Sequence, residues 1–364
     1  MNICLIGESL TSLALAKSLV NKKINVFLFT EKKNNKRHQN RTLGISKKNF
    51  DFFDQNILKI KKNNFWEIDQ IEIFIDRHKN NKLLNFDKNN ETLFSMIKYK
   101  NIYDLLNQNL KNKKFFKKLL IKNENFYKKI MNKNEYDLII NFDPTNKISK
   151  KYFNKKIMKD YNSSAYTTVI EHESLRNKKA IQIFTKYGPI AFLPISKNET
   201  SIVFSIVNQK EKLSESKIFN LIKELNLNFK IKNFKKLENF KLCFHIARNY
   251  YYKNIMNFGD NLHKIHPVAG QGFNMCLRDI EIISGIIENR LSLGLELDHS
   301  IYEEFEKKTK HLNFLFANSV DFIYELFKNE NRFFTELLKK LNRKKNFKNV
   351  LQKFADRGFY NFIV

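Results

Sequence analysis

The sequence predicts an α/β fold with an inserted antiparallel β-sheet and a helical C-terminal region. Three observations predict it. Residues 1–31 read as strand, turn, helix and strand, and the segments IDQIEIFID and KLLNFD within residues 68–90 have short alternating apolar patterns typical of strands. After residue 291, apolar residues recur at helical spacing.

Length and composition set the next limits. The chain has 364 residues, 42% of them hydrophobic, which is enough to bury a large core. No apolar run approaches the roughly 20 residues that span a bilayer, and the N-terminal residues follow a strand pattern rather than a signal-peptide pattern. Cys4, Cys243 and Cys276 are scattered, which predicts no disulfide framework and no metal site and fits a reducing cytoplasm.

The net charge of +29 raises the question of an anionic partner. The basic residues are mostly lysine and are spread along the chain, whereas nucleic-acid sites more often combine clustered arginine with aromatic residues. Nucleic-acid binding is therefore disfavoured. An anionic membrane surface is the more favoured partner, since each nearby lysine contributes roughly 1 kcal/mol of attraction.

The N-terminal unit has the organisation of a dinucleotide-binding βαβ unit. Gly7 follows the first strand and Glu31 ends the second, a spacing that suits an acid bound to an adenosine ribose. The usual G-x-G-x-x-G fingerprint is replaced by glycine at Gly7 and serine at Ser9 and Ser12. By itself this motif fits a βαβ unit without a ligand equally well.

The stretch from Gly259 to Asp279 concentrates residues that are rare in this chain. It contains three of the nine glycines and one of the four prolines. Gly270 and Gly272 flank Gln271 just before a helical pattern, and small residues there let a ligand reach the free N–H groups of a helix N-terminus. A tight turn that caps an ordinary helix is the alternative.

The order of GD, HP, GQGFN and LRD in this stretch resembles the flavin-contacting segment of the class A flavoprotein monooxygenases, most closely the ubiquinone-biosynthesis hydroxylases. The resemblance extends over nearly the whole chain and implies a Rossmann-like FAD-binding domain with an inserted antiparallel substrate domain. It implies that Asp260 binds the ribityl chain of FAD and that the turn lies against the pyrimidine end of the flavin. That turn comprises Gly270, Gln271, Gly272, Phe273 and Asn274. The family usually has GDAAH where this chain has GDNLH.

The same resemblance implies further cofactor-binding residues. Arg41 begins a segment like the family's R-T-x-A-L-S, Asn101 occupies a position facing the flavin, and Asp143 matches the Asp of an A-D-G turn, here followed by Pro144. Each has a plain alternative: Arg41 as a surface cation, Asn101 as a solvent-facing residue, and an altered turn at Asp143, because proline fixes φ and removes a donor.

Two neighbouring residues are placed beside the flavin ring by the resemblance. They are His266 and Pro267, and no pattern in the sequence supplies His266 with an acid–base partner. Ser46 is expected to be the N-cap of the next helix. His311 in the helical region is more often a structural than a catalytic residue.

The predicted organisation divides the chain into six segments. The FAD-binding domain comprises 1–67, 91–160 and 245–290, the substrate domain 68–90 and 161–244, and the helical region 291–364. The resemblance implies hydroxylation of an aromatic ring with FAD, NAD(P)H and O₂, on a polyprenylated phenol of ubiquinone biosynthesis. It also implies a cytoplasmic protein at the inner membrane surface, with other quinone-biosynthesis proteins as candidate partners.

One rival hypothesis stays open. A paralogue without catalytic activity would keep the fold, bind FAD weakly and serve as a scaffold or lipid-binding partner. The two serines in the fingerprint and Pro144 support it, whereas Asp260 and the GQGFN turn favour the enzyme.

Overall fold

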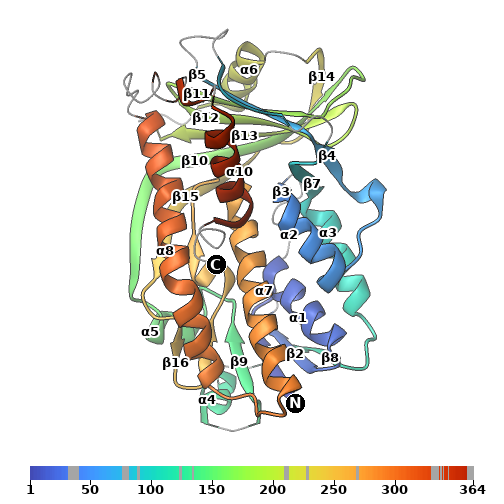
Figure 1. Ribbon diagram of the computed structural model, residues 1–364, viewed down its shortest axis with the longest axis vertical. Helices are drawn as coiled ribbons and strands as arrows, with labels where there is room; N and C mark the ends of the chain where they lie inside the picture. Colours follow the sequence, from blue (N-terminus) through green and yellow to red (C-terminus); the bar gives the residue numbers. More distant parts are fainter. Residues whose placement is uncertain are drawn as a thin grey trace.

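The computed structural model describes residues 1–31, 41–75, 82–87, 91–122, 125–132, 135–208, 213–226, 229–267, 270–328, 336, 338, 340–342 and 344–358. Within these residues the molecule is elongated, with a mainly parallel sheet at one end, a large antiparallel sheet at the other, and long helices alongside both (Figure 1). The α/β class, the antiparallel sheet and the C-terminal helices are confirmed. Residues 359–364 of the predicted helical region lie outside the described residues.

The parallel sheet has the strand order β16-β17-β9-β1-β2-β8. Its central strand is almost completely buried and apolar, as is expected for a parallel strand covered on both faces. The predicted opening unit is confirmed, because β1 and β2 pair in parallel and are connected by the helix α1 (Leu10–Asn21). The strands are β1 (Asn2–Ile6), β2 (Asn25–Thr30), β8 (Phe116–Leu120), β9 (Leu138–Asn141), β16 (Tyr251–Tyr252) and β17 (Ile255–Asn257).

The large sheet has the order β18-β15-β10-β13-β12-β11-β5-β6, and β14 pairs with β10. All its pairs are antiparallel except β5 with β11. Its strands are β5 (Gln70–Ile75), β6 (Lys82–Asp87), β10 (Lys156–His172), β11 (Lys179–Thr185), β12 (Gly188–Pro194), β13 (Glu199–Val207), β14 (Ile231–Phe234), β15 (Glu238–Ala247) and β18 (His263–Lys264).

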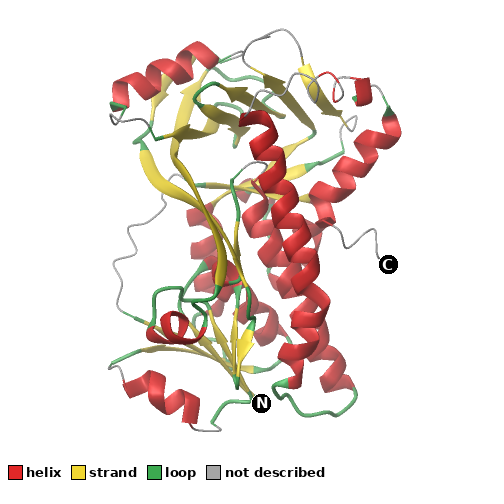
Figure 2. Ribbon diagram, turned by 90° about the vertical axis from the view of Figure 1, so that its left-hand side faces the viewer, coloured by secondary structure: helices red, strands yellow, loops and turns green. Residues whose placement is uncertain are grey.

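Two strands run from the large sheet toward the parallel sheet (Figure 2). They are β10, with 17 residues, and its partner β15, with 10. The boundaries expected at 160/161 and 244/245 therefore fall inside continuous strands, and the two halves are joined by sheet rather than by loops. The division into six segments remains a prediction.

A small third sheet and the remaining helices complete the fold. The sheet has the order β3-β7-β4, formed by β3 (Thr42–Ser46), β7 (Phe94–Lys98) and β4 (Trp66–Ile68). The helices besides α1 are α2 (Lys47–Phe52), α3 (Tyr99–Leu110), α4 (Asn125–Asn132), α5 (Lys147–Tyr152), α6 (Glu215–Leu225), α7 (Gln271–Ser292), α8 (Ser300–Lys328) and α10 (Lys345–Arg357). None of the helices within the described residues is long and apolar enough to cross a membrane.

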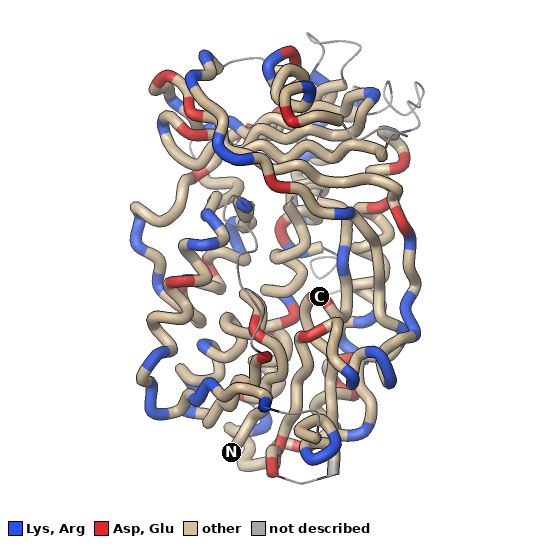
Figure 3. Tube along the Cα trace, turned by 180° about the vertical axis from the view of Figure 1, so that it is seen from behind, with Lys and Arg blue, Asp and Glu red and all other residues tan. Residues whose placement is uncertain are grey.

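The surface carries lysine and arginine on both halves of the molecule rather than in one cluster (Figure 3). The core is divided between the two sheets. One large cluster of buried apolar side chains lies around β1, α1, α3 and α7, and a second fills the space between the large sheet and α6. The cavity described next lies between these two cores.

Candidate cofactor and substrate site

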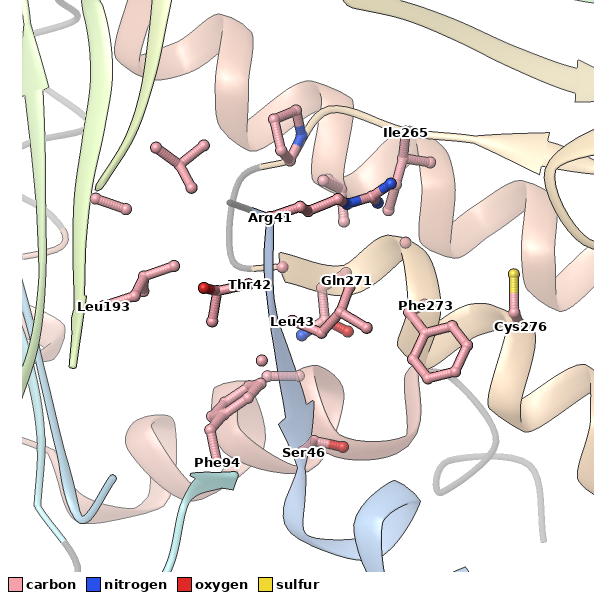
Figure 4. A pocket seen from close by; sticks show the side chains of 18 of the residues that line it. Arg41, Thr42, Leu43, Ser46, Phe94, Leu193, Ile265, Gln271, Phe273 and Cys276 are labelled. Carbon is pink, nitrogen blue, oxygen red and sulfur yellow. The ribbon is translucent and has the colours of Figure 1, made fainter. Parts of the chain in front are cut away.

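One cavity of about 1450 Å³ brings together most of the predicted site residues (Figure 4). Its polar end, which we call the cofactor end, contains the loops after β1, β2 and β9, the Asp260 turn and the start of α7. The other end, the apolar arm, is walled by the large sheet, α8 and α10. Its apolar residues include Ile71, Ile73, Leu84, Phe86, Phe184, Phe316, Val320, Ile323, Phe327, Leu338, Leu341, Phe347, Leu351 and Phe354.

Gly7 is required by the close approach of two loops. It has φ of +97°, and a Cβ at this position would lie 2.8 Å from the backbone nitrogen of Asp143. The two loops leave the adjacent parallel strands β1 and β9 at the same edge of the sheet, where α/β proteins bind their ligands. Gly7 and Asp143 therefore form a narrow base for the cofactor end, and their contact with a cofactor remains a prediction.

The serines that replace the fingerprint glycines close the start of α1. The Ser9 hydroxyl accepts the N–H of Ser12 at 3.1 Å, and the Ser12 hydroxyl accepts the N–H of Ser9 at 2.8 Å. The pair is a reciprocal capping box. Ser12 is fully buried, and its hydroxyl donates to the Ser9 carbonyl at 2.9 Å.

Tyr99 of α3, which the sequence analysis did not select, contacts the start of α1. Its hydroxyl receives a hydrogen bond from the backbone of Leu10, and the Arg41 guanidinium lies 5.7 Å from its ring centroid. Burial raises the pKa of Tyr99, so the hydroxyl stays protonated at neutral pH. With the two serines, Tyr99 engages three of the N–H groups that a phosphate would use.

Acidic side chains line the cofactor end. Glu31 follows β2 as predicted, and its carboxylate accepts a hydrogen bond from the Tyr127 hydroxyl at 2.8 Å. Glu8, which the sequence reasoning did not select, accepts the Tyr103 hydroxyl at 2.6 Å and pairs with Lys118 at 2.5 Å. Burial and the neighbouring Glu8 raise the pKa of Tyr103.

Asp260 lies exposed on a turn at the cavity wall (Gly259–Asn261), and its backbone carbonyl accepts a hydrogen bond from His245 Nε2 at 2.7 Å. Burial lowers the pKa of His245 to about 4, so its ring is neutral at physiological pH. Asp260 itself lines the cavity.

The departures from the family pattern at Asn261 and Pro144 support each other. The Asn261 amide donates to the Ser149 hydroxyl at 3.3 Å, and that hydroxyl donates to the Asp143 carbonyl at 2.5 Å. The Asp143 carboxylate accepts the N–H and the hydroxyl of Thr145, at 2.8 and 2.7 Å. These contacts hold the turn around Pro144 without the glycine that is usual there.

The turn before α7 presents a buried amide to the cavity. Gly270 has φ of +63°, and its N–H bonds the Pro267 carbonyl at 3.0 Å. Gln271 is 2% exposed, and neither end of its carboxamide has a partner within the described part of the chain. A Cβ at Gly272 would contact nothing within 4 Å, and Phe273 lines the wall. A buried amide needs a partner, and a ligand here would supply one.

Three predicted residues are not on the cavity wall. Asn101 is exposed on α3, because helical phase turns Tyr99 and Tyr103 inward instead. Asn274 is fully buried and bonds the carbonyls of Gly44 and Gly270, at 2.8 and 3.1 Å, so it holds the turn rather than facing the cavity.

His266 is the third of these residues. It is 1% exposed, stacks on Tyr324 with ring centroids 4.0 Å apart and meets the edge of Tyr161 at 5.0 Å. Burial lowers its pKa to about 3, so the ring is neutral and packed away from the cavity. Pro267, Arg41 and Asp260 do line the cavity, as expected.

The residues present fit FAD at the cofactor end. The close approach at Gly7, the Gln271 amide without a partner among the described residues, and Asp260 on the cavity wall suit a dinucleotide and a flavin. The closed start of α1 opposes it. Among the described residues, no group of three His, Cys, Asp or Glu could hold a metal ion.

Comparison with known proteins agrees with this geometry. No family profile matches the chain. The chain is 26% identical over 180 residues to a ubiquinone hydroxylase of Rhodospirillum rubrum, covering 47% of this chain and 41% of that protein. It is 26% identical over 175 residues to the 3-demethoxyubiquinol 3-hydroxylase of Escherichia coli, covering 46% and 45%. Each match thus spans less than half the length of the relative.

Solved structures give the fold. The p-nitrophenol 4-monooxygenase of Pseudomonas putida has a TM-score of 0.77 at 8% identity, covering 98% of both chains. The Klebsiella pneumoniae protein HpxO, solved with FAD and uric acid, has a TM-score of 0.73 at 9% identity, covering 99% of this chain and 97% of that one. The chain therefore has the fold of these proteins over nearly its whole length.

Proposed function

We propose that this protein is an FAD-dependent aromatic hydroxylase that uses NAD(P)H and O₂ and acts on a polyprenylated phenol of ubiquinone biosynthesis. The observation that carries the proposal is one cavity with two chemically different ends. A cofactor suits the end with Gly7, Glu31, Arg41 and Asp260, and an isoprenoid tail suits the apolar arm. The names of the ubiquinone-hydroxylase relatives support the same substrate class.

Bound FAD, once reduced by NAD(P)H, supplies the oxygen chemistry with O₂. The protein supplies binding and orientation. Asp260 accepts a hydrogen bond from a ribityl hydroxyl, and Glu31 accepts one from the adenosine ribose. The N-terminus of α7 and the Gln271 amide favour negative charge at the pyrimidine end of the flavin.

The substrate side of the cavity excludes water and orients the ring. Pro267 and the apolar side chains of the arm disfavour water at the reacting edge, and the charged residues Lys241 of β15 and Asp356 of α10 also line the cavity. His266 takes no proton in this scheme, because it is neutral and buried between two tyrosine rings. Hydroxylation at an electron-rich ring therefore depends on placement of the phenol.

The test is the visible absorption spectrum of the purified protein after incubation with excess FAD and removal of free cofactor. A bound flavin spectrum is expected, and a farnesylated phenol should then stimulate NAD(P)H oxidation with formation of a hydroxylated product. Protein that retains no flavin would overturn the proposal.

A second function is favoured by the closed start of α1. A paralogue that binds FAD weakly and acts as a scaffold or lipid-binding partner would tolerate the Ser9–Ser12 box and the Tyr99 contact. Protein that binds a farnesylated phenol and FAD, yet forms no product, would support this alternative.

The site of action proposed is the surface of the inner membrane, on its cytoplasmic side, without a spanning segment. The net charge of +29 and the apolar arm support an anionic, lipid-bearing surface as the source of substrate. Other quinone-biosynthesis proteins are candidate partners there.

A further inference from the structure

The C-terminal helix α10 forms part of the wall of the apolar arm. Phe347, Leu351 and Phe354 recur at helical spacing and line the cavity. Phe354 packs on Phe316 of α8, with ring centroids 4.9 Å apart. Asn349 lies on the opposite side of the helix and is exposed. A ligand in the arm therefore contacts one face of α10.

The last turn of α10 is anchored to the start of α2. The Asp356 carboxylate accepts a hydrogen bond from the N–H of Lys48 at 3.1 Å. The backbone carbonyl of Asp356 accepts hydrogen bonds from the Ser46 hydroxyl and the Asn49 amide, both at 3.2 Å. Ser46 is the N-cap residue of α2 as predicted, but its own side chain does not cap the helix. The cap comes from Asp356, which is distant in sequence.

Ser46 and Asn49 also bond Asn274, on the other side of α2. The Asn274 side-chain oxygen accepts the N–H of Ser46 at 3.0 Å and the amide of Asn49 at 3.1 Å. Asn274 in turn holds the Gly270 carbonyl. Figure 4 shows Ser46 at the end of β3, the strand that follows Arg41 and carries Thr42 and Leu43 along the cavity.

We call Ser46, Asn49, Asn274 and Asp356 the α10 hub. The first three are at most 1% exposed, so a broken contact leaves a buried donor or acceptor without a partner. The hub is therefore favoured as a unit. It connects the wall of the apolar arm with the turn that presents Gln271 to the cofactor end.

We propose that Asn49 and Asp356 are positioning residues that make binding in the apolar arm and binding of FAD cooperative. A tail packed on α10 favours the docked helix, and the docked helix completes the hub that holds the Gly270–Gln271 turn. By linkage, FAD raises the affinity for the tail by the same factor. This inference rests on the proposed function.

The experiment measures FAD affinity by quenching of flavin fluorescence, with and without a saturating farnesylated phenol. In the parent protein the phenol should tighten FAD binding about fivefold and shift the visible flavin band. Asn49→Ala removes the amide that bridges Asn274 and Asp356. In this variant the phenol should change FAD affinity by a factor of about one, and the shift of the flavin band should be lost. Asp356→Ala should reduce both.

Two variants serve as controls. Asp356→Asn keeps an oxygen for the Lys48 N–H and should restore the parental factor, whereas a purely structural loss at this position would not recover a band shift. Asn349→Ala, on the exposed face of the same helix, should behave as the parent. If Asn49→Ala does not fold, the comparison of Asp356→Ala with Asp356→Asn carries the test.

The outcomes separate the two proposals. FAD binding without any effect of the phenol in the parent overturns the cooperative hub and leaves the cofactor assignment intact. The cooperative hub is also overturned if the phenol tightens FAD binding in both Asn49→Ala and Asp356→Ala as much as in the parent. A parent protein that binds no FAD, with or without the phenol, overturns the proposed function and the hub together.

Discussion

Replacing Ser9 and Ser12 together with glycine is expected to tighten FAD binding while it destabilises the free protein. The parent serines bond each other's backbone N–H groups, at 2.8 and 3.1 Å, and so engage two donors at the start of α1. Glycine at both positions frees these N–H groups for a phosphate. It also removes the capping box that the helix uses without a cofactor.

The gain in FAD affinity and the loss of stability come from different interactions. A hydrogen bond to a charged group contributes roughly 1.5–3 kcal/mol, against roughly 0.5–1.5 kcal/mol for a neutral pair. Exchange of one for the other should recover about 1.4 kcal/mol, or about tenfold in FAD affinity. Loss of the cap and of two non-glycine residues should lower the free energy of unfolding by about 1–2 kcal/mol.

The assay combines an FAD titration with urea unfolding of the cofactor-free protein. Ser214→Gly is the matched control, because Ser214 caps α6 through the N–H of Lys217 and does not line the cavity. It should lose some stability with no change in FAD affinity. If the double glycine variant binds FAD no better than the parent, the serines do not compete with the cofactor, and the weakly binding paralogue loses its main support.

Three further outcomes are expected. Asp260→Ala should weaken FAD binding about tenfold to a hundredfold in a titration, whereas Asp298→Ala, away from the cavity, should not. The parent should bind anionic vesicles at low salt and release them at high salt; failure to sediment with them counts against the membrane surface. Because burial lowers the pKa values of His245 and His266 to about 4 and about 3, only the unfolded chain takes up these protons below about pH 6.5. Stability should therefore fall toward pH 5 by about 2 kcal/mol per histidine. Urea unfolding at pH 7 and pH 5 measures this loss of stability. His266→Phe should remove about half of the combined loss from the two histidines, and an equal loss in His266→Phe and the parent would contradict the expectation.

Features encoded by neighbouring residues could be predicted from the sequence. The βαβ opening depends on alternating apolar residues within 1–31, and the Gly270 turn depends on glycines next to a helical pattern. Gly7 and Gln271 belong to these local patterns, the family resemblance indicates Asp260, and all three line the cavity.

Features that depend on remote contacts could not be predicted. Asn101 and Tyr99 are two positions apart on one helix, so only the packing of α3 on α1 decides which of them faces inward. His266 is placed by Tyr161 and Tyr324, which come from β10 and α8. The anchoring of α2 by Asp356 joins residues about three hundred positions apart, and no periodicity in the sequence signals such a contact.

The continuous strands β10 and β15 limit how this protein can be recombined with its relatives. They pair from Lys156 with Ala247 to Thr167 with Glu238, with a register shift between Asp160 and Ser163, so the same pair of strands serves both halves of the molecule. A chimera with a junction inside either strand would break this register and turn apolar side chains toward solvent. Exchange of substrate preference by grafting the large sheet therefore requires transfer of Lys156–His172 and Glu238–Ala247 as complete, matched strands.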